Sequence, residues 1–196
     1  MDEEVQAETL TQRTRKAQLI EVTIALIAAE GYAGVSLSKI AARADITKPA
    51  VLYYFRTTAG VVKAAYEHVL EQLVEHVGAA IDAAPAHEAV TSYADAMIEY
   101  FSQHSDHTKV FIEALTYTDV KPESAARWQP LADLIQQARI ARGLEPHADS
   151  RTTALIIGGA IDGIVTEKVQ DPGYNTVAAA CRLAALIEAS FLNDET

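Results

Sequence analysis

The sequence contains very little cysteine, glycine and proline. Its one cysteine, Cys181, excludes an internal disulfide and a metal site built from several thiolates. Nine glycines and six prolines in 196 residues are few, and alanine is abundant, so helix is favoured nearly throughout. Because 49% of the residues are hydrophobic, disorder is also disfavoured. These features predict an all-α globular protein.

Long hydrophobic runs are missing as well. The longest, from Ala154 to Val165, is too short to span a membrane and contains Asp162. The opening Met1-Asp2-Glu3-Glu4 lacks the charged and then apolar order of a signal peptide. We therefore expect a cytoplasmic protein with no membrane partner.

Positive charge is scarce and is concentrated in one segment. The chain has 16 Lys and Arg against 27 Asp and Glu, a net charge of −11. Residues 1–8 carry −4, and residues 64–196, with eight basic and twenty acidic side chains, carry −12. Residues 9–63 hold eight basic and three acidic side chains, a net charge of +5. An acidic body repels DNA everywhere except at such a basic segment.

The basic segment contains two short predicted helices joined by a tight turn, between Val35 and Arg56. Ser36 can cap the first helix and Thr47 the second, because a hydroxyl accepts a backbone N–H that would otherwise be unpaired. Asp45 suits the turn, since a short acidic side chain tolerates left-handed backbone. Pro49 lies in the first turn of the second helix, where a missing N–H costs nothing. This layout is typical of a DNA-binding helix-turn-helix, although an ordinary helical hairpin is the alternative.

Side chains that can contact phosphate or base edges crowd around the second helix, which favours DNA binding. We expect Thr47, Lys48 and Ala50 to reach base edges or their rim. The residues expected to meet mainly phosphates are Ser38, Lys39, Tyr53, Tyr54 and Arg56. Ser36 and Pro49 complete the predicted DNA-binding set.

Residues 15–62 resemble the N-terminal domain of the tetracycline-repressor (TetR) family of transcriptional regulators. The matching stretches are Ile27–Tyr32, Ser36–Ala41 and Ile46–Phe55. The resemblance implies a three-helix helix-turn-helix DNA-binding domain, residues 1–57. It also implies a C-terminal helical ligand-binding and dimerisation domain, residues 58–196, giving about nine helices in all.

Three positions depart from the usual pattern of the family. Asp45 stands where the family usually has the turn glycine, and Leu52 where a tyrosine is common on the recognition helix. Thr58 stands where a lysine usually opens the fourth helix and meets a phosphate. Leu52 and Thr58 each weaken one expected DNA contact, and Arg56 can partly replace the lysine.

Apolar spacing predicts helices along the rest of the chain. The expected helices cover about residues 10–30, 58–82, 87–104, 107–118, 123–142, 148–169 and 174–192. The long helix 58–82 contains no proline, so it can carry motion between domains. The last two helices, the first of which contains Gly158, Gly159 and Gly163, are expected to form a four-helix interface with their symmetry mates. A buried hairpin within a monomer is the alternative.

Aromatic residues gather in the middle helices, and Asp162 lies within an otherwise apolar helix. Core packing is the default explanation, but Tyr and Trp carry polar groups and commonly line pockets. The TetR resemblance implies a cavity for a small-molecule effector among these helices. The predicted lining residues are Tyr66, Tyr93, Met97, Tyr100, Phe101, Phe111, Tyr117, Trp128 and Asp162.

Motifs for catalysis or cofactor binding are missing. No Gly-rich phosphate loop, dinucleotide fingerprint or catalytic triad is evident, so neither a cofactor nor a catalytic residue is predicted. His104 and His107, with Glu113 beyond, make a metal site conceivable, but histidines at a helix junction are the preferred interpretation and no metal is predicted.

The combined prediction is a ligand-responsive repressor that binds a pseudo-palindromic double-stranded DNA operator as a homodimer and leaves it when a small molecule binds. An all-α small-molecule enzyme and a helical protein-interaction module are the alternatives.

Overall fold

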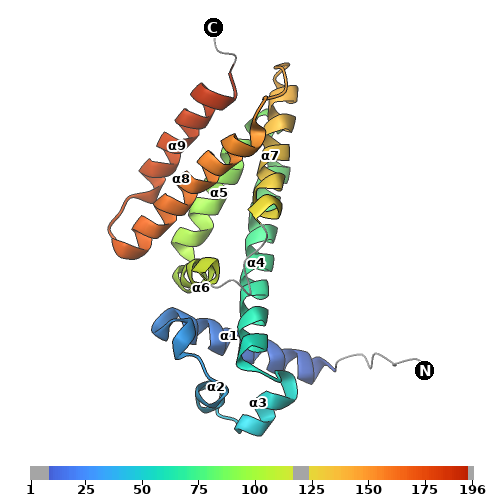
Figure 1. Cartoon of the computed structure of the whole chain (residues 1–196), viewed down its shortest axis with the longest axis vertical. Coiled ribbons are helices and arrows are strands. Elements are labelled where there is room, and N and C mark those ends of the chain that lie inside the picture. The colour runs from blue at the N-terminus through green and yellow to red at the C-terminus, as the bar shows by residue number, and fades with distance from the viewer. Residues whose placement is uncertain (1–8, 117–123, 194–196) are drawn as a thin grey trace, which may run out of the picture.

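The structure, a computed structural model, describes residues 9–116 and 124–193, and these residues form nine α-helices and no strand (Figure 1). The predicted all-α fold is confirmed. The helices are α1 (Leu10–Glu30), α2 (Leu37–Arg43), α3 (Lys48–Tyr54), α4 (Thr58–Ala83), α5 (Ala89–Gln103), α6 (Ser105–Thr116), α7 (Ser124–Ala141), α8 (Ser150–Gln170) and α9 (Thr176–Phe191). Two short 3₁₀ turns, η1 (Tyr32–Gly34) and η2 (Ala86–Glu88), precede α2 and α5.

The N-terminal helices begin at hydroxyl caps, and those of α2 and α3 are the predicted ones. Thr9 caps α1 in a capping box with Gln12, and Ser36 and Thr47 cap α2 and α3 by accepting backbone N–H groups at 3.2 and 3.3 Å. Asp45, in the turn between α2 and α3, has φ 52°, so it adopts the left-handed backbone expected of it.

The N-terminal core lies between α1, α2 and α3 and continues into α4. Leu19, Leu26, Ile40 and Val51 are completely buried there. The first half of α4 adds Val61, Val62, Ala65 and Val69, and α6 adds Val110. Because α4 contributes to both cores, it links the two halves, and the boundary after residue 57 remains a prediction.

The C-terminal core is formed by the rest of α4 with α5, α7, α8 and α9. Its fully buried residues include Ile98, Ile135, Ile157, Ile161 and Ile187. An apolar stripe along α4 is buried from Val61 to Val77, and its last members, Leu73 and Val77, belong to this second core.

The start of α6 differs from the sequence-based expectation. α6 begins at Ser105 because the break falls at His104, where φ is −117° and ψ is 71°. α7 begins at Ser124, close to its predicted start, and contains Pro130 in its interior. In the part of the chain that the structure describes, no helix is long and apolar enough to cross a membrane.

Candidate DNA-binding and effector sites

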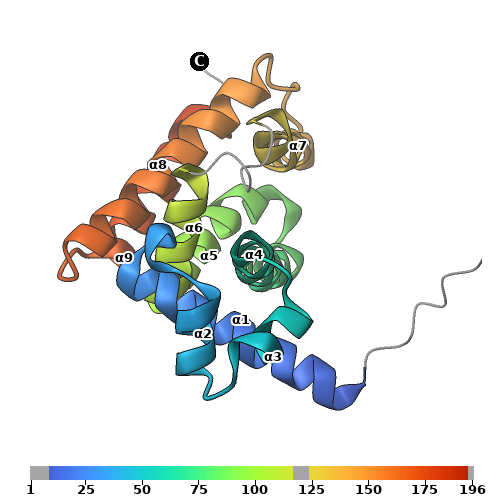
Figure 2. The ribbon, with the colours of Figure 1, turned by 60° about the horizontal axis from the view of Figure 1, so that its bottom comes forward.

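The surface of α3 is set by one buried residue. Val51 is completely buried against the N-terminal core, and this fixes which face of α3 turns outward. The outward face carries Lys48, Pro49, Leu52 and Tyr53, and Tyr53 is 70% exposed. Figure 2, seen from this end of the molecule, shows α2 and α3 side by side next to α1. A short helix that packs on the core with its inner side and is exposed at its outer side can enter a DNA groove.

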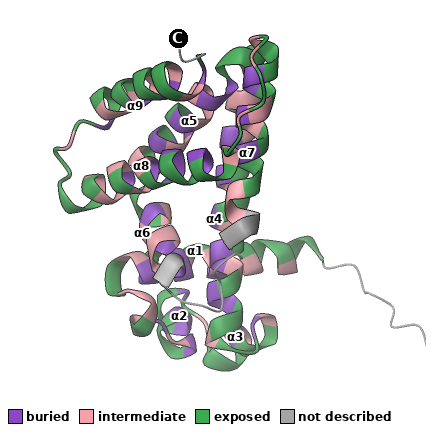
Figure 3. Ribbon diagram, turned by 45° about the horizontal axis from the view of Figure 1, so that its top comes forward, coloured by how far each residue is buried: buried purple, intermediate pink, exposed green. Residues whose placement is uncertain are grey.

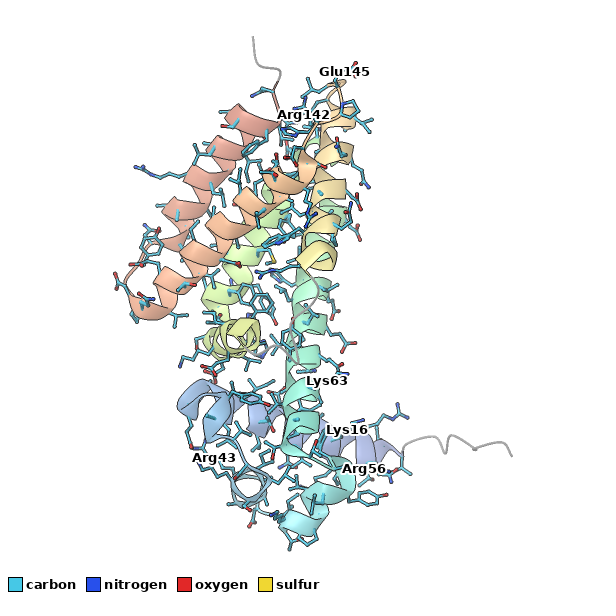
Figure 4. All side chains as sticks on the ribbon, viewed as in Figure 1. Lys16, Arg43, Arg56, Lys63, Arg142 and Glu145 are labelled. Carbon is cyan, nitrogen blue, oxygen red and sulfur yellow. The ribbon has the colours of Figure 1, made fainter. Side chains whose placement is uncertain are left out.

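Basic side chains gather at the same end of the molecule. In Figure 4 the labelled Lys16, Arg43, Arg56 and Lys63 lie around α1 to α3 and the start of α4, whereas Arg142 lies at the opposite end. Arg56 is exposed and lies two residues after the end of α3. The basic segment of the sequence therefore forms one region of the surface.

Lys39 already has partners within the chain. Its ammonium lies 2.6 Å from Oε2 of Glu30 and donates to the carbonyl of Gly34 at 2.8 Å, and Arg43 contacts the same carboxylate at 3.1 Å. The hydrogen bond from Lys39 lowers the pKa of Glu30. A phosphate contact by Lys39, which remains a prediction with the other DNA contacts, would have to compete with Glu30.

The two tyrosines of α3 are supported by α1. The Gln12 side-chain amide donates to the Tyr53 hydroxyl at 2.9 Å, and the Tyr53 and Tyr54 rings meet edge to face at 5.0 Å. Tyr54 is half-buried against the N-terminal core. Gln12 lies 41 residues before Tyr53, so sequence spacing could not identify it as a supporting residue.

Phe111 lies at the centre of the predicted effector-binding residues. Its ring centroid is 4.9 Å from that of Phe101 and 6.4 Å from that of Tyr66. Tyr93, Met97 and Trp128 are partly buried and pack against the same core. Helices α4 to α7 thus bring most of the predicted set together, while Tyr117 lies outside the described residues.

Tyr100 belongs to a neighbouring polar group of histidines. Its hydroxyl is 2.8 Å from Nδ1 of His107, and its ring stacks on His104 at 4.4 Å. Burial raises the pKa of Tyr100 to about 12 and lowers the pKa of His107. Among the described residues no group of three or more His, Cys, Asp or Glu side chains could hold a metal ion.

The predicted Asp162 has a partner that sequence reasoning missed. Nη2 of Arg127, on α7, donates to Oδ2 of Asp162, on α8, at 2.6 Å. The Arg127 guanidinium also lies 4.4 Å from the ring centroid of Trp128 and 5.9 Å from that of Phe111. Arg127 precedes Asp162 by 35 residues, and no motif in the sequence relates the two.

The charges of Arg127 and Asp162 influence the pKa of the nearby Tyr93. Burial raises the pKa of Asp162, although the Arg127 guanidinium acts in the opposite direction. The pKa of Tyr93 is raised to about 12, mainly by burial and to a smaller extent by the Asp162 carboxylate. Tyr93 is therefore a neutral hydroxyl close to a carboxylate at neutral pH.

A surface hollow of about 490 Å³ lies away from the aromatic residues. Its lining residues are His87, Glu88, Thr91, Asp95, Arg142, Ala184, Ala185 and Glu188. None of the predicted effector-binding residues lines it. Arg142 spans one side, with Nη1 2.6 Å from Oε2 of Glu188 and Nε donating to the carbonyl of His87.

The outer faces of α8 and α9 are apolar. Leu155 and Ile156 on α8 and Val177 and Leu186 on α9 are exposed, and Val177 is 74% accessible. Figure 3 shows exposed surface along both helices. A Cβ atom placed on Gly159 or Gly163 would meet nothing within 4 Å, whereas one on Gly158 would lie 1.9 Å from Cζ3 of Trp128. Gly158 thus permits internal packing, and Gly159 and Gly163 open onto the surface.

Comparison with known proteins places the N-terminal region in a described family. Residues 19–65 match the family model of bacterial regulatory proteins, tetR family. The HTH-type transcriptional regulator BetI of Paraburkholderia xenovorans (strain LB400) is 41% identical over 59 residues, which are 30% of either chain. BetI of Burkholderia thailandensis is 38% identical over 73 residues, 35% of this chain and 37% of that protein. The match thus spans about a third of these curated relatives.

Solved structures resemble nearly the whole chain. A transcriptional regulator from Pseudomonas aeruginosa PAO1 has a TM-score of 0.78 at 23% identity and covers 96% of this chain and 95% of its own. FadR from Bacillus subtilis, in complex with stearoyl-CoA, has a TM-score of 0.76 at 20% identity, covering 87% and 96%. A regulator from Saccharomonospora viridis, in complex with choline, has a TM-score of 0.73 at 18% identity, covering 93% and 100%. At these identities the likeness establishes the fold.

Proposed function

Through residues 19–65 the chain belongs to the TetR family of bacterial regulatory proteins, and from this premise we propose that it is a ligand-responsive transcriptional repressor and not an enzyme. It binds a pseudo-palindromic operator in double-stranded DNA as a homodimer and leaves the operator when a small molecule binds. The observation that carries the proposal is the outward face of α3, placed by the buried Val51 at the basic end of an acidic protein.

In this proposal α3 enters the major groove. Lys48 opens the helix and Thr47 and Ala50 lie beside it, so these three residues reach base edges or their rim. Tyr53, Tyr54 and Arg56 follow toward the backbone and contact phosphates with Ser38 and Lys39. The exposed Leu52 shares the outward face with Lys48, where an apolar side chain can meet a thymine methyl group.

The homodimer joins through the outer faces of α8 and α9. Support comes from the exposed Leu155, Ile156, Val177 and Leu186, since contiguous exposed apolar surface marks interaction sites. The open Gly159 and Gly163 allow a second backbone to approach closely. A two-fold dimer presents two copies of α3, which match successive major grooves when they are about 34 Å apart.

Release by the effector requires a physical link between the two cores. α4 contributes side chains to both, from Val61 in the first to Val77 in the second. On α6, Val110 lies in the N-terminal core while the adjacent Phe111 packs against the C-terminal one. An effector among the aromatic residues would favour positions of α4 and α6 in which the two copies of α3 no longer fit the operator.

The fold is known to accept small molecules in other proteins. The regulators from Bacillus subtilis and Saccharomonospora viridis, which share it, are described with stearoyl-CoA and with choline. By analogy, the residues grouped around Phe111 form the effector site of this chain. The bound molecules of those two proteins differ in chemistry, so they do not select one effector class here.

Selection of bound sequences from a random duplex library tests the proposal. We expect enrichment of a pseudo-palindrome, with binding to the selected duplex that falls by about tenfold or more between 50 and 200 mM salt. Recovery of no duplex at low salt would overturn the proposal. The substitution Lys48→Ala, at the exposed start of α3, should weaken binding to the selected duplex.

A further inference from the structure

The Arg127 side chain occupies a position suited to a free organic cation. We propose that the effector carries a compact cationic group, such as a quaternary ammonium, which replaces the Arg127 guanidinium between Asp162, Trp128 and Phe111. This inference rests on the proposed function, since it specifies the effector class for the same aromatic site.

The position holds a cation because three groups with negative potential converge on it. Oδ2 of Asp162 is 2.6 Å from Nη2 of Arg127. The faces of Trp128 and Phe111 lie 4.4 and 5.9 Å from the guanidinium carbon. A carboxylate with aromatic faces is the combination by which proteins bind quaternary ammonium groups. The chain therefore fills this cation site with a side chain of its own.

Arg127 is the member of the ion pair that can leave. Asp162 has a short side chain within α8, next to the fully packed Ile161. Arg127 has a long, flexible side chain near the start of α7 and is 22% exposed, while Asp162 is 36% exposed. Both ends of the pair thus reach solvent, and the guanidinium can move into water while its apolar stem stays packed. An incoming group would replace the cation and not the carboxylate.

The charge around the site favours a cation over an anion. Residues 64–196 carry a net charge of −12, so the domain attracts cations and repels anions over several ångströms. Tyr93 adds a hydroxyl whose pKa of about 12, raised by burial and by Asp162, keeps it neutral. Because the carboxylate is partly shielded from water, its attraction for a cation is stronger than at an open surface.

The single tryptophan of the chain makes the site directly observable. Trp128 is the only Trp among the 196 residues, so intrinsic fluorescence reports on its surroundings alone. Full-length protein would be titrated at constant ionic strength with tetramethylammonium and with two probes of similar shape, uncharged neopentyl alcohol and anionic pivalate. We expect a saturable change with tetramethylammonium at concentrations about tenfold or more below those of the other two.

Two substitutions should change the affinity for tetramethylammonium in opposite directions. Arg127→Gln removes the competing internal cation, so tetramethylammonium should bind several-fold more tightly, while Asp162→Asn should weaken it about tenfold or more. Arg151→Gln, at an exposed arginine on α8, is the matched control and should change nothing. The melting temperature of each variant verifies folding, and the comparison of probes on the wild type requires no variant.

The outcomes separate this inference from the proposed function. Pivalate binding that is lost in Arg127→Gln and kept in Asp162→Asn would overturn the inference of a cationic effector in favour of an anionic one. Absence of a saturable response to any probe would also overturn it. Operator binding is measured separately without probes. A protein that binds an operator but not tetramethylammonium refutes the cation site alone, whereas one that binds tetramethylammonium but no duplex refutes the repressor alone.

Discussion

The backbone N–H of Tyr32 donates a hydrogen bond to Oε2 of Glu113, with 2.9 Å between the two atoms. Tyr32 follows Gly31, which ends α1 with a φ of 71°, and Glu113 lies 81 residues later on α6. α6 also places Val110 in the N-terminal core. The helix that carries Phe111 is therefore fixed to the end of α1, next to the helix-turn-helix.

Removing the Glu113 carboxylate should weaken the attachment of α6 to the end of α1. Glu113→Ala takes away the acceptor of the Tyr32 N–H, and losing a partly buried hydrogen bond of this kind costs about 1–2 kcal/mol in the free energy of unfolding. Urea denaturation measures the cost, and hydrogen exchange should become faster at the Tyr32 amide. Glu113→Gln keeps an oxygen acceptor and should lose less. Asp106→Ala, exposed on the same helix, is the control, and unchanged exchange at Tyr32 in Glu113→Ala would contradict the assignment.

The turn of the helix-turn-helix should tolerate glycine better than alanine. Asp45 has φ 52°, a conformation that costs little for glycine or Asp and about 1 kcal/mol for alanine. Thermal unfolding should show Asp45→Ala destabilised by roughly this amount. Asp45→Gly should stay within about 0.5 kcal/mol of the wild type, because relief at the turn offsets the greater entropy of the unfolded chain. Equal effects of the two substitutions would show that the backbone conformation is not decisive.

The neighbouring glycines of α8 should respond differently to substitution. Gly158→Ala would drive a Cβ atom into the Trp128 ring, and such overpacking costs about 1–3 kcal/mol. Its melting temperature should fall while its subunit association stays unchanged. A Cβ atom at Gly159 meets nothing within 4 Å, so the monomer should tolerate Gly159→Leu. The proposed dimer of this variant should dissociate at a higher protein concentration than the wild type does and bind its operator less tightly.

Sedimentation at matched concentrations separates these two effects. A Gly159→Leu variant that associates and binds DNA as the wild type does would exclude α8 from the interface. A wild type that sediments as a monomer at about 10–50 μM would refute the dimer itself, and the paired-groove mechanism with it.

The two ends of α3 should contribute differently to DNA recognition. Lys48→Ala, at the exposed start of the helix, should reduce discrimination between operator and random DNA, with about 1–3 kcal/mol lost on the operator alone. Tyr54→Phe, near the phosphate backbone in the proposed complex, should weaken binding to all duplexes similarly. Competition assays with mutated operators measure both. An equal loss on operator and random DNA for Lys48→Ala would make Lys48 a phosphate contact.

Cation binding at Asp162 should depend on pH in one direction. Burial raises the pKa of Asp162 above its ordinary value, against the opposing effect of Arg127, and Tyr93 faces the same carboxylate with a pKa of about 12. A cation requires the ionised carboxylate, so tetramethylammonium affinity should be constant near neutral pH and fall as the pH drops through the raised pKa. Fluorescence titrations between about pH 4 and 8 measure this, and Asp162→Asn should remove the dependence.

The amino-acid sequence by itself determined the features that depend on neighbouring residues. The hydroxyls of Ser36 and Thr47 start α2 and α3, Asp45 takes the left-handed turn, and the apolar spacing along α4 becomes a buried stripe. Each of these follows from contacts within about one or two helical turns, where the geometry of the backbone is already known. The all-α class and the helix-turn-helix were predictable for the same reason.

Only the tertiary structure decided which distant side chains meet. Lys39 reaches Glu30, Gln12 supports Tyr53, and Arg127 joins Asp162. The same is true of Gly158, which packs under Trp128 while the adjacent Gly159 faces outward. These contacts depend on how helices far apart in the sequence cross and rotate against each other. Many arrangements of the helices satisfy the same apolar spacing, and packing of the complete core selects one of them.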